Sequence, residues 1–124
     1  MTDVLFEFYR GDTYTRDFIL KGWSFPVSNV YFTVKENVEN KKACLQKTLN
    51  NGIVVADETE EGMVFNLRIN STDTDKLKAD YDYVFDIEVH SDMGEEIIKK
   101  TLVTGTLRLF ASATKTYNEV IINE

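Results

Sequence analysis

Cysteine and histidine each occur only once among the 124 residues of this chain. One cysteine excludes an internal disulfide framework, and one histidine excludes any site that needs two imidazoles. The N-terminus lacks a basic segment followed by an apolar run, so we expect no signal peptide. Apolar runs are only a few residues long, far short of the ~20 residues that span a bilayer. These absences together predict a soluble chain that folds in a reducing cytoplasm.

Positive charge is also scarce, because 14 lysines and arginines stand against 21 aspartates and glutamates. The formal net charge is therefore -7. An acidic chain repels phosphate backbones and anionic lipid surfaces. We therefore expect neither a nucleic-acid partner nor a membrane partner.

Motifs that carry chemistry are missing as well. The sequence contains no nucleophile elbow, P-loop, dinucleotide-binding glycine pattern or zinc-protease motif. His90 has only Glu88 beside it on a polar face, Cys44 lacks the positive cluster that activates a thiol, and the acidic segment 57–61 lacks EF-hand spacing. We therefore predict no catalytic residue, no cofactor and no metal site, although a carboxylate pair for glycoside hydrolysis is compatible with the composition.

What the sequence does contain is period-two alternation of apolar and polar residues, which is typical of half-buried strands. Met63, Phe65, Leu67 and Ile69, for example, alternate with polar or smaller side chains. We expect about seven strands. The eight candidate segments are 4–9, 13–20, 29–36, 43–48, 53–55, 63–70, 82–90 and 97–110. Between two of them, residues 73–77 are predicted to form at most one short helical turn.

These strands predict an all-β fold. Parallel strands need long crossover connections, which the short turns do not provide, so the sheets should be antiparallel. Two facing sheets bury all the apolar stripes together. We therefore expect an immunoglobulin-like sandwich, with a closed barrel as the alternative. The chain should be a single domain, 1–124, with its core at about 4–110 and a C-terminal tail, 111–124, that carries the apolar patch 120–122.

Two smaller features have a structural interpretation. Tyr81 or Tyr83, at the start of a central strand, is expected either to form a tyrosine corner, with its hydroxyl bonded to the backbone upstream, or to be a plain core or rim aromatic. Arg10-Gly11-Asp12 spells an adhesive tripeptide, but Gly11 suits a turn and Asp12 can bond the backbone beyond it.

Several apolar residues fall on the faces that we assign to solvent. They are Leu5, Tyr31, Val64, Val84 and Leu102. Aligned on one sheet, such residues make a patch that marks protein contact, and an edge strand can pair with another chain. Tyr31, Val64, Val84 and Leu102 are therefore the predicted interaction surface, and a homo-oligomer is the predicted state.

Three stretches, in order, carry a family resemblance that covers about residues 8–110. The first is Tyr9-Arg10-Gly11-Asp12-Thr13 with alternation to Phe18. The second is the segment 30–35, followed by 45–48 and by Gly52-Ile53, and the third is the tyrosine-rich segment 81–89 followed by 101–107. Together they resemble the N-terminal domain of phage baseplate upper proteins and related short proteins of tailed phages and prophages of Gram-positive bacteria.

The resemblance implies an immunoglobulin-like sandwich and a non-enzymatic structural role in the virion. Such a protein would be made in the bacterial cytoplasm and would dock with other tail or baseplate proteins. Full baseplate proteins continue into a long helical region, whereas this sequence stops at Glu124, so a small accessory, tail or head-decoration component fits equally well. The alternative function is a carbohydrate- or cell-surface-binding sandwich, which needs aromatic residues such as Trp23, Tyr31 and Tyr117 in one groove. An enzyme is the third hypothesis.

Overall fold

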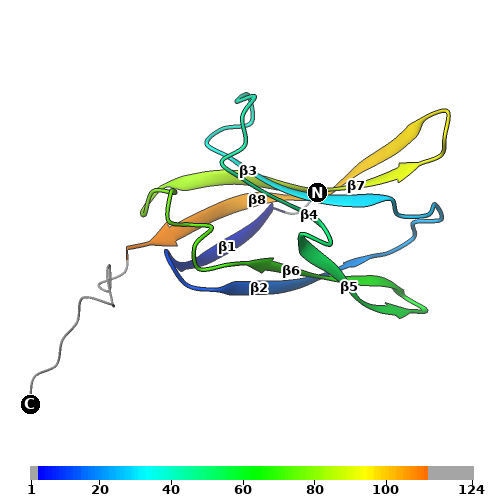
Figure 1. The fold of residues 1–124 in the computed structure, drawn as a ribbon, viewed down its shortest axis with the longest axis horizontal. Helices are drawn as coiled ribbons and strands as arrows, with labels where there is room; N and C mark the ends of the chain where they lie inside the picture. The colour runs from blue at the N-terminus through cyan, green and yellow to red at the C-terminus, as the bar shows by residue number, and fades with distance from the viewer. Residues whose placement is uncertain (1–2, 112–124) are drawn as a thin grey trace, which may run out of the picture.

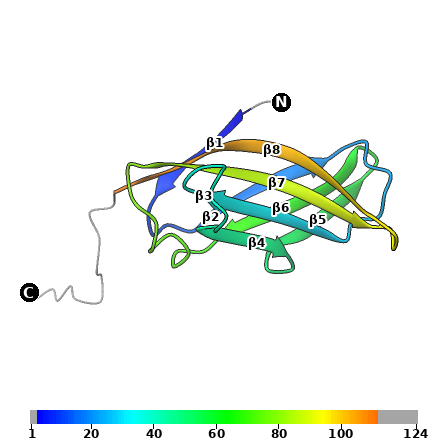
Figure 2. The same ribbon diagram turned by 90° about the horizontal axis from the view of Figure 1, so that it is seen from above.

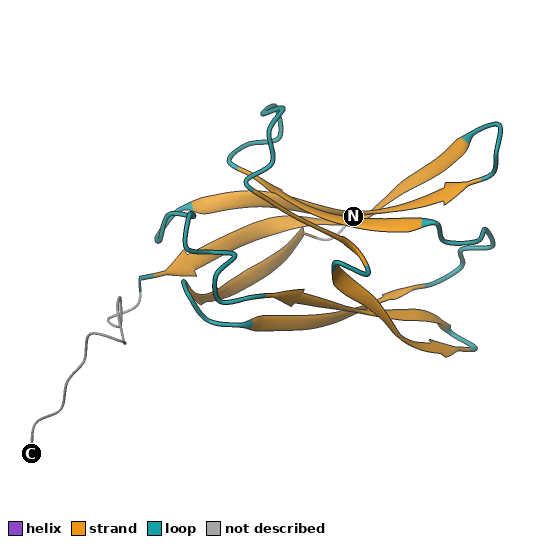
Figure 3. Cartoon of the chain, in the orientation of Figure 1, coloured by secondary structure: helices purple, strands orange, loops and turns teal. Residues whose placement is uncertain are grey.

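The computed structural model describes residues 3–111, and in that range the chain is all-β with no helix (Figure 3). The prediction of an all-β fold is confirmed. Its eight strands are β1 (Asp3–Tyr9), β2 (Tyr14–Leu20), β3 (Asn29–Lys35), β4 (Leu45–Leu49), β5 (Gly52–Thr59), β6 (Gly62–Ile69), β7 (Asp82–Asp92) and β8 (Ile97–Phe110).

The alternation in the sequence explains which side chains form the core. On β7, Tyr83, Phe85, Ile87 and Val89 are buried, because successive side chains of a strand point to opposite faces. The same rule buries the alternate apolar residues of β3 and β6. The fully enclosed side chains of these strands are Val30, Phe32, Val34, Phe65, Leu67 and Ile69.

All eight strands belong to one hydrogen-bonded sheet in the order β1-β8-β7-β3-β4-β5-β6-β2. The sheet curls into two layers, with β3, β7 and β8 above β2, β5 and β6 in Figure 1, and Figure 2 shows the same arrangement from above. The core lies between the layers. The two separate sheets and the count of about seven strands that we expected are therefore not what the hydrogen bonding shows.

The expectation of purely antiparallel pairing is wrong at two places. β1 runs parallel to β8 along its whole length, from Asp3 opposite Thr104 to Tyr9 opposite Phe110. β4 also makes a short parallel pairing with β5. The crossover argument opposes extended parallel pairing of consecutive strands, and the parallel pairing of β4 with β5 is only two residue pairs long. β1 and β8 lie at opposite ends of the described chain, so the rest of the fold serves as their connection.

β1 and β2 are the end strands of the sheet and do not pair with each other. Their side chains close the gap instead. The rings of Phe8 and Tyr14 stack with centroids 4.4 Å apart. The guanidinium of Arg16 lies 5.2 Å from the centroid of the Phe6 ring, which is within the range of cation–π attraction. An inward-pointing charge on an edge strand also opposes pairing with a foreign strand.

The assignment of Leu102 to an outer face is wrong, because this half-buried residue packs against the core. The cause is a β-bulge between β7 and β8. Ile87 pairs with Val103, whereas Glu88 pairs with Thr101, so Leu102 is an extra residue without a partner opposite it. Such a bulge shifts the inward-outward alternation of the strand by one position.

Residues 73–77 form hydrogen-bonded turns rather than a helix. The N–H of Leu77 donates to the carbonyl of Thr74 at 3.0 Å, and the N–H of Asp73 donates to that of Asn70 at 3.0 Å. Thr74 is fully buried, and its hydroxyl oxygen accepts the N–H of Gly11 at 2.9 Å. These contacts fasten the β6–β7 connection to the turn between β1 and β2.

Candidate functional site

The outer face of β3 and β7 carries a ladder of polar side chains. Antiparallel pairing places Thr33 opposite Asp86, Tyr31 opposite Glu88, and Asn29 opposite His90. Because all of these positions alternate with buried core residues, their side chains share the solvent-facing side of the sheet. We call this surface the outer face.

Two adjoining hollows lie on the outer face. One, of about 360 Å³, runs past Tyr31, Gln46, Glu88 and His90. The other, of about 310 Å³, extends across β7 and β8 past Val84 and Thr106. Both are lined by Thr33, Lys35 and Asp86. The two hollows therefore form one groove, which we name the outer-face groove.

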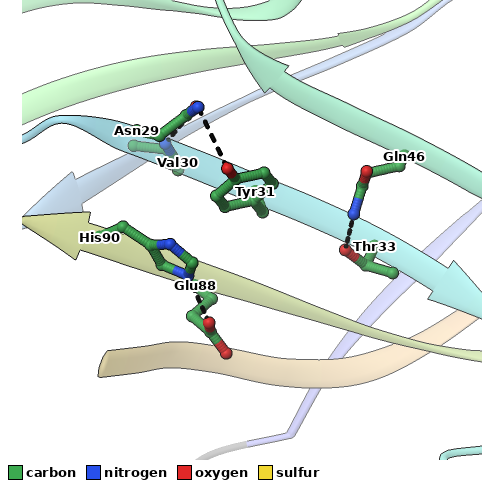
Figure 4. A network of polar contacts seen from close by, with 7 residues as sticks. All are labelled: Asn29, Val30, Tyr31, Thr33, Gln46, Glu88 and His90. Carbon is green, nitrogen blue, oxygen red and sulfur yellow. Dashed lines mark hydrogen bonds and ion pairs between the residues drawn. The ribbon is translucent and has the colours of Figure 1, made fainter. Parts of the chain in front are cut away.

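Hydrogen bonds hold the polar side chains of the groove in place (Figure 4). His90 Nε2 lies 2.5 Å from Glu88 Oε1, and the imidazole packs 4.6 Å from the centre of the Tyr31 ring. The amide of Asn29 donates to the Tyr31 hydroxyl at 3.3 Å. The amide of Gln46 donates to the Thr33 hydroxyl at 3.0 Å. The groove thus presents an aromatic ring surrounded by fixed donors and acceptors.

Asp86 is a carboxylate of the groove, and its pKa is raised above the ordinary value. Burial raises the pKa of the Asp86 carboxyl, the neighbouring Glu88 carboxylate raises it further, and Lys35 opposes the shift. Burial disfavours the ionised form because it removes water from the charge. Ionisation of Asp86 is therefore less favourable than that of an aspartate fully exposed to water.

An ion-pair cluster borders the groove where β1, β8 and β7 lie side by side. Arg108 on β8 donates two hydrogen bonds to the Asp82 carboxylate, at 2.5 and 2.9 Å, and one to Glu7 at 3.1 Å. The Arg108 hydrogen bond lowers the pKa of Asp82 and outweighs the opposing effect of burial. The same contacts raise the pKa of Arg108 above its ordinary value. Two carboxylates on different strands thus share one cation.

The residues of the predicted interaction surface do not gather in one place. Tyr31 and Val84 line the outer-face groove, in its two different hollows. Val64 lies on β6 in the other layer, directly opposite Ile19 of β2. Leu102 packs against the core. Leu5 is 46% exposed on β1, as expected for an outer position.

The aromatic residues named for a carbohydrate site are also separate. The indole Nε1–H of Trp23 donates to the Ser91 hydroxyl at 2.9 Å, and the ring packs against the core. Trp23 lines a hollow that does not include Tyr31. Tyr117 lies outside the described residues, as does the apolar patch 120–122.

The tyrosine-corner prediction is confirmed for Tyr83. Its hydroxyl accepts the backbone N–H of Lys78 at 2.7 Å, while its ring is buried. Tyr81 instead packs its ring against that of Tyr83, with centroids 4.7 Å apart. The hydroxyl of Tyr83 therefore fixes the chain where it enters β7.

The tripeptide Arg10-Gly11-Asp12 lies in a turn, and Cys44 lies on the surface. Arg10 donates to the carbonyl of Leu77 at 3.3 Å, and Gly11 adopts a φ of 92°, so the tripeptide forms the β1–β2 turn. Cys44 is an exposed free thiol.

Among residues 3–111, no group of three or more His, Cys, Asp or Glu side chains is placed to hold a metal ion. The described part of the chain also has no helix with the length and apolar character for crossing a membrane.

The sequence did not predict that polar residues of β3 and β7 form one groove. The signal was present in the polar residues that alternate with core residues on two segments, Asn29–Lys35 and Asp82–Asp92. Their pairing register was needed to bring Asp86 beside Thr33 and Glu88 beside Tyr31. Register depends on contacts between strands that are distant in sequence.

No family model matches the chain, and no curated protein matches it. Among solved structures, the extracellular portion of mouse CD200RLa is similar to it with a TM-score of 0.41 and 6% sequence identity. The similarity covers 89% of this chain and 57% of that one, so this chain spans little more than half of that structure. A likeness at this level supports no inference about function.

Proposed function

We propose that the chain is a non-enzymatic structural protein of a phage or prophage virion. In this proposal it is made in the bacterial cytoplasm and joins a tail or baseplate through protein–protein contact. The observation that carries the proposal is the order and spacing of the three stretches that resemble baseplate upper proteins. They include the turn after β1, the β3–β4–β5 region and the β7–β8 pair.

We also propose that the fold is an immunoglobulin-like sandwich. One layer would be β1-β8-β7-β3-β4 and the other β5-β6-β2. Two features favour this division. Only two residue pairs join β4 to β5, Thr48 with Gly52 and Leu49 with Ile53. The tyrosine corner at Tyr83 is a recurrent feature of such sandwiches.

A stiff frame with apolar residues on its outside suits assembly. Ile19 and Val64 face each other across β2 and β6, and Val54 lies on the adjoining strand β5. Ile19 is 40% exposed and Val54 is 48% exposed. We assign Ile19, Val54 and Val64 as the contact patch, because neighbouring apolar side chains lose water together when another surface covers them. In a symmetric assembly, many such weak contacts add up.

The assembly proposal is tested by size-exclusion chromatography with light scattering over a range of concentrations. We expect a homo-oligomer that is weakened when a charge is introduced by Ile19→Lys with Val64→Lys. Thr15→Lys, at another exposed position of β2, is the matched control and should leave the oligomer intact. A chain that stays monomeric at every concentration and binds no tail protein would contradict the proposal.

The virion assignment has its own test. We expect an antibody against the chain to detect it in purified phage particles from the organism that encodes it. The chain should be present in the density-gradient fractions that contain particles and absent from the fractions that do not, as a known tail protein is. Particles that lack the chain would show that the virion assignment is wrong, even if the chain forms oligomers.

A carbohydrate- or cell-surface-binding module is the second candidate function. It is favoured by the Tyr31 ring, which lies in the outer-face groove among hydrogen-bonding groups of Gln46, Glu88 and His90. Sugars bind to such combinations of an aromatic face and fixed polar groups. A glycan array should give signals that Tyr31→Ala abolishes, and an array without signals would remove this candidate.

A further inference from the structure

The β2–β3 loop and the β5–β6 turn lie at the same end of the molecule (Figure 1). Residues of both line a third hollow. Its volume is about 560 Å³. The loop contributes Trp23 and Phe25, and the end of β5 with the β5–β6 turn contributes Glu58, Glu60 and Glu61. We name this the aromatic–acidic hollow. It is separate from the outer-face groove and shares no lining residue with it.

The aromatic wall of the hollow is held in place. The Trp23 indole N–H donates to the Ser91 hydroxyl at 2.9 Å, and the Phe25 ring meets the indole edge to face, with centroids 5.3 Å apart. Phe25 nevertheless remains 37% exposed. An aromatic surface that is both fixed and open to solvent can accept a ligand without first being ordered.

Three glutamates and no basic residue line the hollow, and Lys21 stands beside it in the chain, between the lining residues Leu20 and Gly22. Within residues 3–111, the side chains of Glu58, Glu60 and Glu61 have no hydrogen-bond or ion-pair partner. Two half-buried carboxylates elsewhere in the described chain are paired. Asp73 binds Lys47, and Glu88 binds His90. Negative charge beside aromatic rings attracts cations in two ways, by Coulomb attraction and by the ring quadrupole.

We propose that the aromatic–acidic hollow binds a lysine or arginine side chain presented by a partner protein. The aliphatic stem of that side chain would lie along Trp23 and Phe25, and its cationic head would meet the glutamates. The inference goes beyond the assembly role, because such a hollow would accept a basic side chain whatever structure the chain belongs to. An anionic or purely apolar partner lacks the charge that these carboxylates require.

The test uses Trp23, the only tryptophan of the chain, as the reporter. A tri-arginine peptide is titrated into the full chain at constant ionic strength, and a tri-glutamate peptide serves as the comparison ligand. We expect a saturable change of Trp23 emission with tri-arginine alone. The affinity should fall as salt is added, because exposed charges are screened.

The matched variants separate the hollow from the overall charge. Glu58→Gln with Glu60→Gln and Glu61→Gln should weaken tri-arginine binding by about tenfold or more. A control that removes the same charge from exposed positions elsewhere, Glu36→Gln with Glu39→Gln and Asp75→Asn, should bind nearly as the unaltered chain does. Circular dichroism of each variant verifies that it folds.

Three outcomes would overturn the proposal. They are an emission that tri-arginine leaves unchanged, an equal response to both peptides, and equal weakening by the two sets of substitutions. None of these results bears on oligomerisation, so a failure here is distinguishable from failure of the assembly proposal.

Discussion

The ammonium group of Lys47 lies 2.7 Å from a carboxylate oxygen of Asp73, which ties β4 to the connection between β6 and β7. Lys47 occupies a core-facing position between Leu45 and Leu49, and only 9% of its side chain is exposed. The same carboxylate oxygen of Asp73 accepts the N–H of Asn70 at 2.6 Å. This ion pair therefore compensates a charge that the fold has largely removed from water.

Asp73→Ala is expected to lower the free energy of unfolding by about 3 kcal/mol, because it leaves the Lys47 charge buried without a partner. Lys47→Met with Asp73→Ala should lose clearly less, since no unpaired ammonium remains. Urea denaturation of both variants measures the difference. A double variant as unstable as Asp73→Ala alone would contradict this account.

Tyr83→Phe should destabilise the chain by about 1 kcal/mol, because the backbone N–H of Lys78 loses its part-buried hydrogen bond to the Tyr83 hydroxyl. Tyr81→Phe is the control, since the Tyr81 hydroxyl has no hydrogen-bond partner in the part of the chain that the structure describes. Chemical denaturation followed by Trp23 fluorescence compares the two. Equal losses would show that the Tyr83 hydroxyl does not secure the entry to β7.

The raised pKa of Asp86 predicts how stability changes with pH. Its ordinary value is 3.8, and in the folded chain it is higher, so the folded state binds the proton more tightly than the unfolded state does. The contribution of Asp86 is therefore favourable at low pH and is lost as pH rises from 3.8 through the folded value.

Asp86→Asn removes the buried charge, so we expect it to stabilise the chain at neutral pH. The gain over the unaltered chain should shrink as the pH falls below the folded pKa. Thermal unfolding at neutral and at acidic pH tests this, with Asp75→Asn as an exposed control. A gain that is independent of pH would rule out the titration of Asp86 as its cause.

Gly105→Ala is expected to destabilise the pairing of β1 with β8. A Cβ atom at Gly105 would lie 2.1 Å from the carbonyl oxygen of Val4 and 2.6 Å from the Phe85 ring. The backbone would have to move, at a cost of about 1–3 kcal/mol or more. Thr106→Ala, at the next position, is the control. Hydrogen exchange should show the loss of protection in β1 first, and unchanged exchange there would contradict the close approach.

Much of the strand content could be predicted from the sequence, but the candidate site could not. The alternation in Met63–Ile69 and in Tyr83–Val89 identified the strands and their buried faces. It did not reveal the outer-face groove, because that groove depends on β3 and β7 lying in one particular register. Alternation also failed at Leu102, where the bulge depends on how β8 pairs with β7.

The amino-acid order by itself determined the all-β character, the inward residues of most strands and the tyrosine at the start of β7. These follow from local geometry, because neighbouring side chains of an extended chain must point to opposite faces. The tertiary structure alone decided that β1 runs parallel to β8, that Lys47 meets Asp73, and that Trp23 and Glu58 line the same hollow. Each of these joins residues far apart in sequence, and burial of the whole core, rather than any local pattern, selects which distant segments meet.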